Sequence, residues 1–148
     1  MVTCTYFSAS DDESALGVLD GFGGPDSTTF DVVSLKGIDP VVVIAQLEAV
    51  LTACTYEEAR QRPRSGQLLS SPEAEDAFVV SVSGTLQEAL ASATPPSLSE
   101  AAGPWCASDE LQDLGTTPEE ATEVLERLAG LAGRARATSS RLYCWWAL

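Results

Sequence analysis

Histidine is absent from the 148 residues of this protein, and lysine occurs once, at Lys36. Without histidine, the chain has no imidazole to act as general base in Ser-His-Asp or Cys-His catalysis, or as a nitrogen ligand of a metal. No catalytic constellation built from other residue types is recognisable in the sequence. We therefore expect a protein without enzymatic activity, metal or other cofactor, although the absence of histidine alone does not exclude every enzyme.

Positive charge is scarce as well: the chain has 22 acidic and 8 basic residues, which gives a formal net charge of −14. A nucleic acid or an anionic membrane surface requires a basic face, so both are disfavoured as partners. No run approaches the roughly 18 apolar residues that cross a bilayer, and the start "MVTCTYFSAS" has no targeting pattern, which predicts a cytoplasmic protein. A macromolecular partner would be basic; the alternative is that the acidity only maintains solubility.

Closely spaced cysteines are missing too. Cys4, Cys54, Cys106 and Cys144 lie far apart, and no C-x-x-C pair occurs, which excludes a zinc ribbon and a thioredoxin-like motif. Scattered cysteines in a protein without a secretion signal are typically reduced and buried.

The remaining composition is that of a globular protein, with 45% hydrophobic and 20% charged residues. Residues 1–148 are expected to form a single domain. β-Branched and aromatic residues predict four strands, at 2–7, 29–35, 77–82 and 141–148.

The last strand, "RLYCWWAL", is apolar on both faces. Alternation places Leu142, Cys144 and Trp146 on one side, and Tyr143 and Trp145 on the other. Such a strand belongs inside a sheet that is covered on both faces by the chain, or by helices on one face and a second subunit on the other. We therefore predict a central strand with tryptophans in the core, the alternatives being an exposed tryptophan patch and a homodimer.

Helix starts are marked by Ser or Thr followed three residues later by Glu, the capping-box pattern. The five pairs are Ser10–Glu13, Thr55–Glu58, Thr85–Glu88, Ser97–Glu100 and Thr117–Glu120. Asp39 followed by Pro40 marks a further start, and 3.6-residue periodicity predicts a long helix from Pro118 to about Ala137. The order β-α-β-α(α)-β-α-α-α-β indicates an α/β or α+β fold, with an approximately four-stranded sheet flanked by helices.

Two segments could contact a ligand. The only basic cluster, Arg60, Arg62 and Arg64, lies in "YEEARQRPR" (56–64), where a predicted surface loop (61–76) begins. It could bind a carboxylate or phosphate, or pair with Glu57, Glu58 and Glu73 at the surface.

The second segment is "PWCASDE", with Trp105 and Cys106 in a connection bounded by proline and glycine. A helix capped by Ser108 is expected to follow, and a thiol close to a helix N-terminus can react as thiolate. The alternative is that Trp105 packs this connection onto the core.

Two other stretches fail the requirements of their sites. "DGFGGPD" (20–26) follows a predicted helix and precedes a strand, the reverse of a phosphate-binding loop. The acids at 11–13 lack the spacing of a calcium loop.

The stretches "TYFSASDDESALGVL" (5–19) and "GIDPVVVIAQLEAVLTA" (37–53), with the final long helix and apolar strand, resemble the YfbM-like family of uncharacterised bacterial proteins. The Trp-x-x-(Ile/Leu)-His stretch expected in the second helix of that family is absent. The resemblance implies a small α/β fold of bacterial origin and supplies no catalytic residues.

Three functional hypotheses remain. The first is a non-enzymatic, immunity-like or regulatory module whose acidic surface binds a basic protein. The second is a binder of a small anionic ligand, or an unusual enzyme, centred on Trp105, Cys106 and the loop from Arg60 to Arg64. The third is self-association through an uncovered sheet face.

Overall fold

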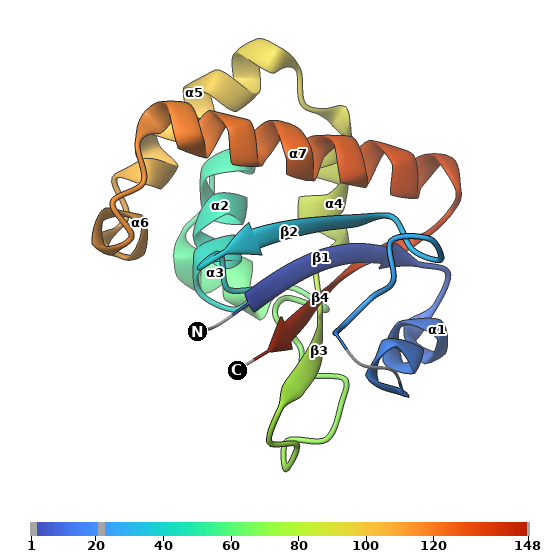
Figure 1. Ribbon diagram of the computed structural model, residues 1–148. Coiled ribbons are helices and arrows are strands. Elements are labelled where there is room, and N and C mark those ends of the chain that lie inside the picture. The colour runs from blue at the N-terminus through green and yellow to red at the C-terminus, as the bar shows by residue number, and fades with distance from the viewer. Residues whose placement is uncertain (1–2, 21–22, 148) are drawn as a thin grey trace.

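The first and last strands of the chain lie side by side at the centre of one antiparallel sheet (Figure 1). The computed structural model describes residues 3–20 and 23–147. The sheet order is β2-β1-β4-β3, with every neighbouring pair antiparallel. The elements are β1 (Thr3–Ala9), α1 (Asp12–Leu16), η1 (Gly17–Asp20), β2 (Val32–Lys36), α2 (Val43–Leu51), α3 (Tyr56–Gln61), β3 (Ala77–Ser81), α4 (Gly84–Ser92), α5 (Pro95–Cys106), α6 (Asp109–Asp113), α7 (Pro118–Ala137) and β4 (Arg141–Ala147).

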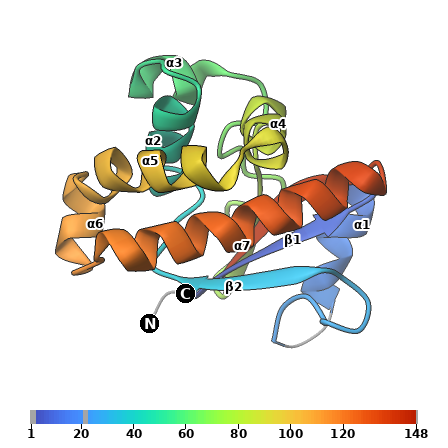
Figure 2. The ribbon, with the colours of Figure 1, turned by 90° about the horizontal axis from the view of Figure 1, so that it is seen from above.

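Helices cover the two faces of the sheet unequally. The long α7 runs across one face with α4 and α5 packed against it, and α2 packs against α4 and α5 (Figures 1 and 2). On the other face, α1 and η1 cover only part of the sheet, together with Phe30 and Leu69 from loops. The larger core therefore lies between the sheet and the helical layer.

β4 contributes to both cores, as the sequence predicted. Leu142 and Cys144 are buried under the helical layer, whereas Tyr143 is buried in the smaller cluster with Phe7. Trp145 and Trp146, near the end of the strand, are partly buried and pack against the smaller and the larger cluster, respectively. Because β4 pairs with both β1 and β3, it joins the edge strand β3 to the rest of the sheet.

The fold class is confirmed as α+β, with four strands at the predicted places. Two details differ: four helices, not three, separate β3 from β4, and β2 begins at Val32 instead of residue 29. The later start has a local cause. The carboxylate of Asp26 accepts the N–H of Thr28, and its carbonyl accepts the N–H of Phe30, so a turn occupies the residues before the strand.

The capping predictions are correct for α3 and α7. Thr55 accepts the N–H of Glu58, and Thr117 forms a reciprocal capping box with Glu120. Asp39 also acts as expected, because its carboxylate accepts the N–H groups of Val41 and Val42 just before α2.

The other three capping predictions are wrong by one to three residues. The residues that cap α1, α4 and α5 are Asp11, Ser83 and Thr94. In each case another Ser, Thr or Asp lies close to the predicted residue, and every one of these types can accept a backbone N–H. Spacing alone therefore could not choose between neighbouring caps.

Candidate functional site

The three arginines of the basic cluster have separate intramolecular partners. Arg60 donates through Nη1 to the carbonyl oxygen of Ser65 at 2.8 Å. Arg62 pairs with Glu48 of α2 at 2.7 Å, and Arg64 pairs with Asp12 of α1 at 2.8 Å. The predicted partners Glu57, Glu58 and Glu73 were wrong: the ion pairs are formed with acids from distant helices, and these pairs attach the loop to the body of the protein.

Glu48 is a buried carboxylate with only 1% of its surface exposed. Besides the ion pair with Arg62, it accepts hydrogen bonds from the hydroxyls of Ser83 and Thr85 at the start of α4. A buried carboxylate is tolerated when it is paired and hydrogen-bonded in this way. Arg62 and Glu48 therefore connect α2, α4 and the loop, which is a structural role.

Asp12 and Arg64 form a second cluster together with Tyr143 of β4. Both terminal nitrogens of Arg64 bond the carboxylate of Asp12, at 2.8 and 3.2 Å, and the Tyr143 hydroxyl donates to the same carboxylate at 2.7 Å. The guanidinium also lies 5.7 Å from the centre of the Tyr143 ring. These bonds from Arg64 and Tyr143 lower the pKa of Asp12 to about 2, while burial and the bond to Asp12 raise the pKa of Tyr143 to about 12.

Trp105 and Cys106 lie within the last turn of α5, and the expectation that they form an irregular connection was wrong. Trp105 is 1% exposed and donates through Nε1 to the carbonyl oxygen of Val43 at 3.1 Å. The Cys106 thiol is buried and donates to the carbonyl oxygen of Thr116 at 2.8 Å. Trp105 therefore packs α5 onto the core, as the structural alternative predicted.

Ser108 does occupy the N-cap position of α6. Its hydroxyl accepts no N–H from the first turn, and it has no hydrogen-bond partner among the residues that the structure describes. Ligand binding at Trp105, Cys106, Arg60, Arg62 and Arg64 remains a prediction.

Arg64 also lines a pocket that the sequence did not reveal. This pocket, which we call the arginine pocket, has a volume of about 380 Å³. Its lining residues are Arg64, Val82, Gly84, Gln87, Glu88, Arg136, Ser139, Ser140 and Arg141. Three of the eight basic residues of the chain thus meet at one place, although they come from a loop, from the end of α7 and from the start of β4.

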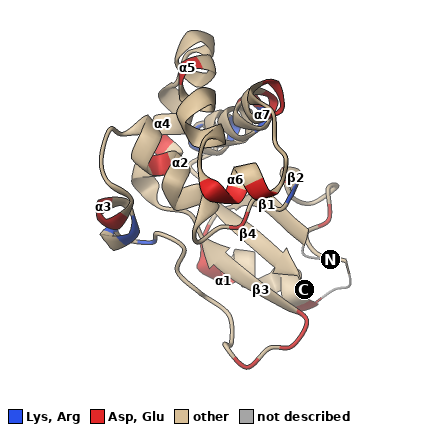
Figure 3. Ribbon diagram, turned by 90° about the vertical axis from the view of Figure 1, so that its left-hand side faces the viewer, with Lys and Arg blue, Asp and Glu red and all other residues tan. Residues whose placement is uncertain are grey.

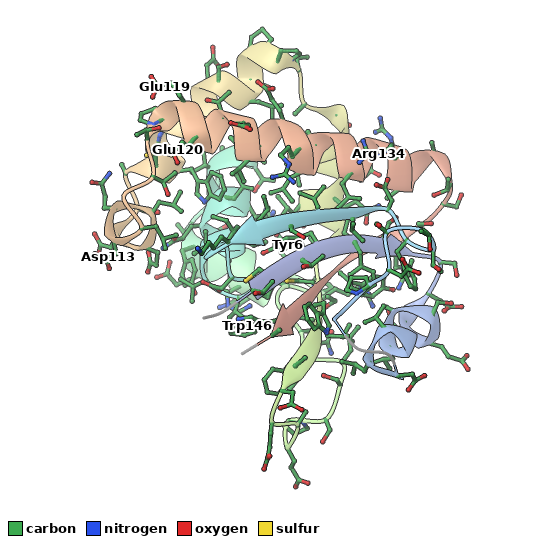
Figure 4. All side chains as sticks on the ribbon, in the orientation of Figure 1. Tyr6, Asp113, Glu119, Glu120, Arg134 and Trp146 are labelled. Atoms are coloured by element: carbon green, nitrogen blue, oxygen red, sulfur yellow. The ribbon has the colours of Figure 1, made fainter. Side chains whose placement is uncertain are left out.

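The opposite end of α7 carries the main acidic surface. Figure 3 shows acidic residues over α6 and the start of α7, and in Figure 4 the labelled Asp113, Glu119 and Glu120 lie at one end of α7 and Arg134 at the other. We call the carboxylates of this region the acidic end. Its members are Asp109, Glu110, Asp113, Glu119, Glu120, Glu123 and Glu126.

The charges of the acidic end are not neutralised by ion pairs. The four ion pairs between described residues join arginines to Glu48, Asp12, Asp31 and Glu88, all outside this region. The sequence from 65 to 126 contains no lysine or arginine. Leu114 lies among these carboxylates and is 49% exposed.

Comparisons with known proteins found no matching family model, no matching curated protein and no matching solved structure. Within residues 3–20 and 23–147, no helix is long and apolar enough to cross a membrane. In the same part of the chain, no three His, Cys, Asp or Glu side chains are arranged so that they could hold a metal ion.

Proposed function

We propose that this protein is a non-enzymatic interaction module, immunity-like or regulatory, that binds a basic protein partner through its acidic end. The observation that carries the proposal is the separation of charge along the molecule. Four arginines outside this region, Arg62, Arg64, Arg134 and Arg136, are paired with acids, whereas the seven carboxylates of the acidic end have no ion pair within the described chain. A surface of one sign accelerates association with a partner of opposite charge and excludes partners of like charge.

Part of this acidity has a local explanation. Glu119 and Glu120 lie in the first turn of α7, where the helix dipole favours carboxylates, and Glu120 also completes the capping box. The dipole acts only within the first turn, so it does not account for Asp113 at the end of α6 or for Glu123 and Glu126 further along α7. Those three are therefore the carboxylates whose removal tests binding without removing a cap.

Leu114 gives the surface an apolar centre. It follows α6 directly, and its side chain lies against Gly37, at the end of β2. Protein interfaces commonly combine a few apolar anchors with a charged rim. The exposed Leu114, next to Asp113 in the chain, provides such an anchor, and it favours a basic protein over a small basic molecule.

The test compares two triple variants with the same change of charge. D113N/E123Q/E126Q removes three carboxylates from the acidic end, and E73Q/E75Q/D76N removes three from the exposed loop before β3. Each protein is immobilised and used to retain proteins from the source cell at low ionic strength. A retained basic partner is then purified, and its affinity is measured by calorimetry at several salt concentrations.

We expect the acidic-end variant to lose at least tenfold in affinity, the loop variant to change by less than about threefold, and the affinity of the unmodified protein to fall as salt increases. Equal effects of the two variants would show that only net charge matters. That result, or the retention of no basic protein at low ionic strength, would overturn the proposal.

A further inference from the structure

We propose that the arginine pocket binds the phosphoryl group of a small phosphorylated molecule. This inference goes beyond the proposed function and does not depend on it, because the pocket and the acidic end lie at opposite ends of α7. The lining contains Arg64, Arg136 and Arg141 and one acid, Glu88, and the charge of Arg64 is already paired with Asp12. A chain with a net charge of −14 has few basic residues, and three of them meet in this pocket.

Arg141 is the guanidinium with the greatest freedom to bind a ligand. It is the first residue of β4, and its backbone pairs with Ala9 of β1. This pairing between the two central strands fixes the backbone of Arg141. The side chain makes no hydrogen bond or ion pair with another described residue. Its five N–H donors are therefore available to a ligand or to water.

The ion pair of Arg136 is long and exposed. Its Nη1 lies 3.5 Å from Glu88, and both members of this pair are about half exposed or more. The guanidinium also donates to the hydroxyl of Ser92 at 3.0 Å and to the carbonyl oxygen of Ala91 at 3.3 Å. An exposed ion pair at this distance contributes little to stability. Arg136 can therefore turn towards an anion in the pocket without a large loss.

Arg64 is held in place by the bidentate bond to Asp12 and forms a fixed wall of the pocket. Its backbone has φ = 67°, and Ser139 on the other side has φ = 55°, a region that favours glycine. Two non-glycine residues in this conformation thus line the same pocket. At Ser139 this conformation belongs to the turn that ends α7.

Further donors surround the three arginines. Ser139 and Ser140 line the pocket, and Gly84 is the first residue of α4, so its N–H has no acceptor within the helix. The positive end of that helix dipole also favours an anion. A phosphoryl group, with three terminal oxygens and nearly two negative charges, matches this number of donors better than a carboxylate, which has two oxygens and one charge.

The proposal is tested by calorimetric titration of the full chain with inorganic phosphate, phenyl phosphate and acetate at equal, low ionic strength. Variant R141Q removes the free guanidinium, and R136Q removes the weakly paired one. R127Q, which replaces an exposed arginine of α7 outside the pocket, is the matched control because it changes the net charge by the same amount.

We expect saturable binding of one phosphate per chain, similar or tighter binding of phenyl phosphate, and much weaker binding of acetate. R141Q and R136Q should each weaken phosphate binding by about tenfold, the usual effect of losing a charge-assisted hydrogen bond, and R127Q by less than about twofold. The acidic-end variant D113N/E123Q/E126Q should bind phosphate normally, so that failure of one proposal is distinguishable from failure of the other.

Three results would overturn the proposal. The first is the absence of saturable phosphate binding. The second is an equal loss in R127Q, which would indicate a general effect of charge. The third is a preference for acetate, or binding of inorganic phosphate but not of the ester.

Discussion

Asp12, Arg64 and Tyr143 show how single side chains join distant parts of this protein. Asp12 and Tyr143 are 131 residues apart in the sequence, and Asp12 and Arg64 are 52 residues apart. Their bonds link α1, the loop after α3 and the central strand β4. The same bonds hold the pKa of Asp12 near 2, below its ordinary value of 3.8, because they favour the ionised carboxylate.

The cluster predicts how acid affects stability. A carboxylate with a lowered pKa in the folded state stabilises the protein above its unfolded pKa, and this contribution is lost as the pH falls through the folded pKa. The variant D12N lacks this contribution at every pH. We therefore expect the difference in unfolding free energy between the unmodified protein and D12N to be constant above about pH 5 and to shrink towards about pH 2.

Urea unfolding followed by tryptophan fluorescence at a series of pH values would measure this difference. D113N, which removes an exposed carboxylate outside the cluster, is the control and should not show the same change. A difference between D12N and the unmodified protein that does not depend on pH in this range would contradict the bonding described for Asp12.

At the scale of the element, α7 combines several local signals. It begins with a proline and a capping box, and it buries a stripe of Leu and Ala against the sheet and against α4 and α5. Its acids precede its arginines in the direction that the helix dipole favours. Its end has the hydrogen bonds of a Schellman motif: the N–H of Ser140 bonds the carbonyl oxygen of Ala135, and that of Ser139 bonds the carbonyl oxygen of Arg136.

This motif predicts that the variant S139G is more stable than the unmodified protein. Ser139 occupies the position at which glycine is strongly preferred, with φ = 55°. Relief of the left-handed conformation outweighs the greater freedom of glycine in the unfolded chain, and we expect a gain of about 0.5 to 1 kcal/mol in unfolding free energy. Urea unfolding checks the gain. S140G, one residue beyond the left-handed position, is the control, and equal or lower stability of S139G would contradict the prediction.

At the scale of the whole molecule, β4 is the element on which the sheet depends. It pairs with β1 along its entire length and with β3 over five residues. Its alternate side chains enter the two clusters on opposite faces of the sheet. β4 therefore connects β1 with the edge strand β3.

Removal of residues 145–148 should abolish cooperative unfolding. Truncation of a buried tryptophan costs about 3 to 5 kcal/mol, and the loss of two that are partly buried, with their strand pairing, approaches the 5 to 15 kcal/mol that stabilises a typical domain. The control deletes four residues, Pro72 to Glu75, from the exposed loop before β3, where such changes are tolerated. Urea unfolding measures both variants, and a cooperative transition in the C-terminal truncation would contradict the central role of β4.

The strands and helices of this fold depend on local sequence patterns, so most of them could be predicted from the sequence. A strand that is apolar on both faces requires cover on both sides, which predicted the central place of "RLYCWWAL" before any pairing was known. The capping box at Thr117 and the 3.6-residue periodicity after it predicted α7 for the same reason, since both depend on residues a few positions apart. Where neighbouring residues could serve equally well as caps, as at Ser83 and Thr85, the local pattern was not sufficient.

The tertiary structure alone determines which residues come together at each candidate site. The basic cluster around Arg64 was visible in the sequence, but Arg136 and Arg141 join it only because the end of α7 turns into a strand beside β1 and β3. The proline and glycine before Trp105 and Cys106 predicted an irregular connection, yet both residues are helical because α5 continues through Pro104 and packs on α7 and α2. Hydrophobic periodicity and capping report on neighbours along the chain, whereas ion pairs and pockets join side chains that only the packed fold brings together.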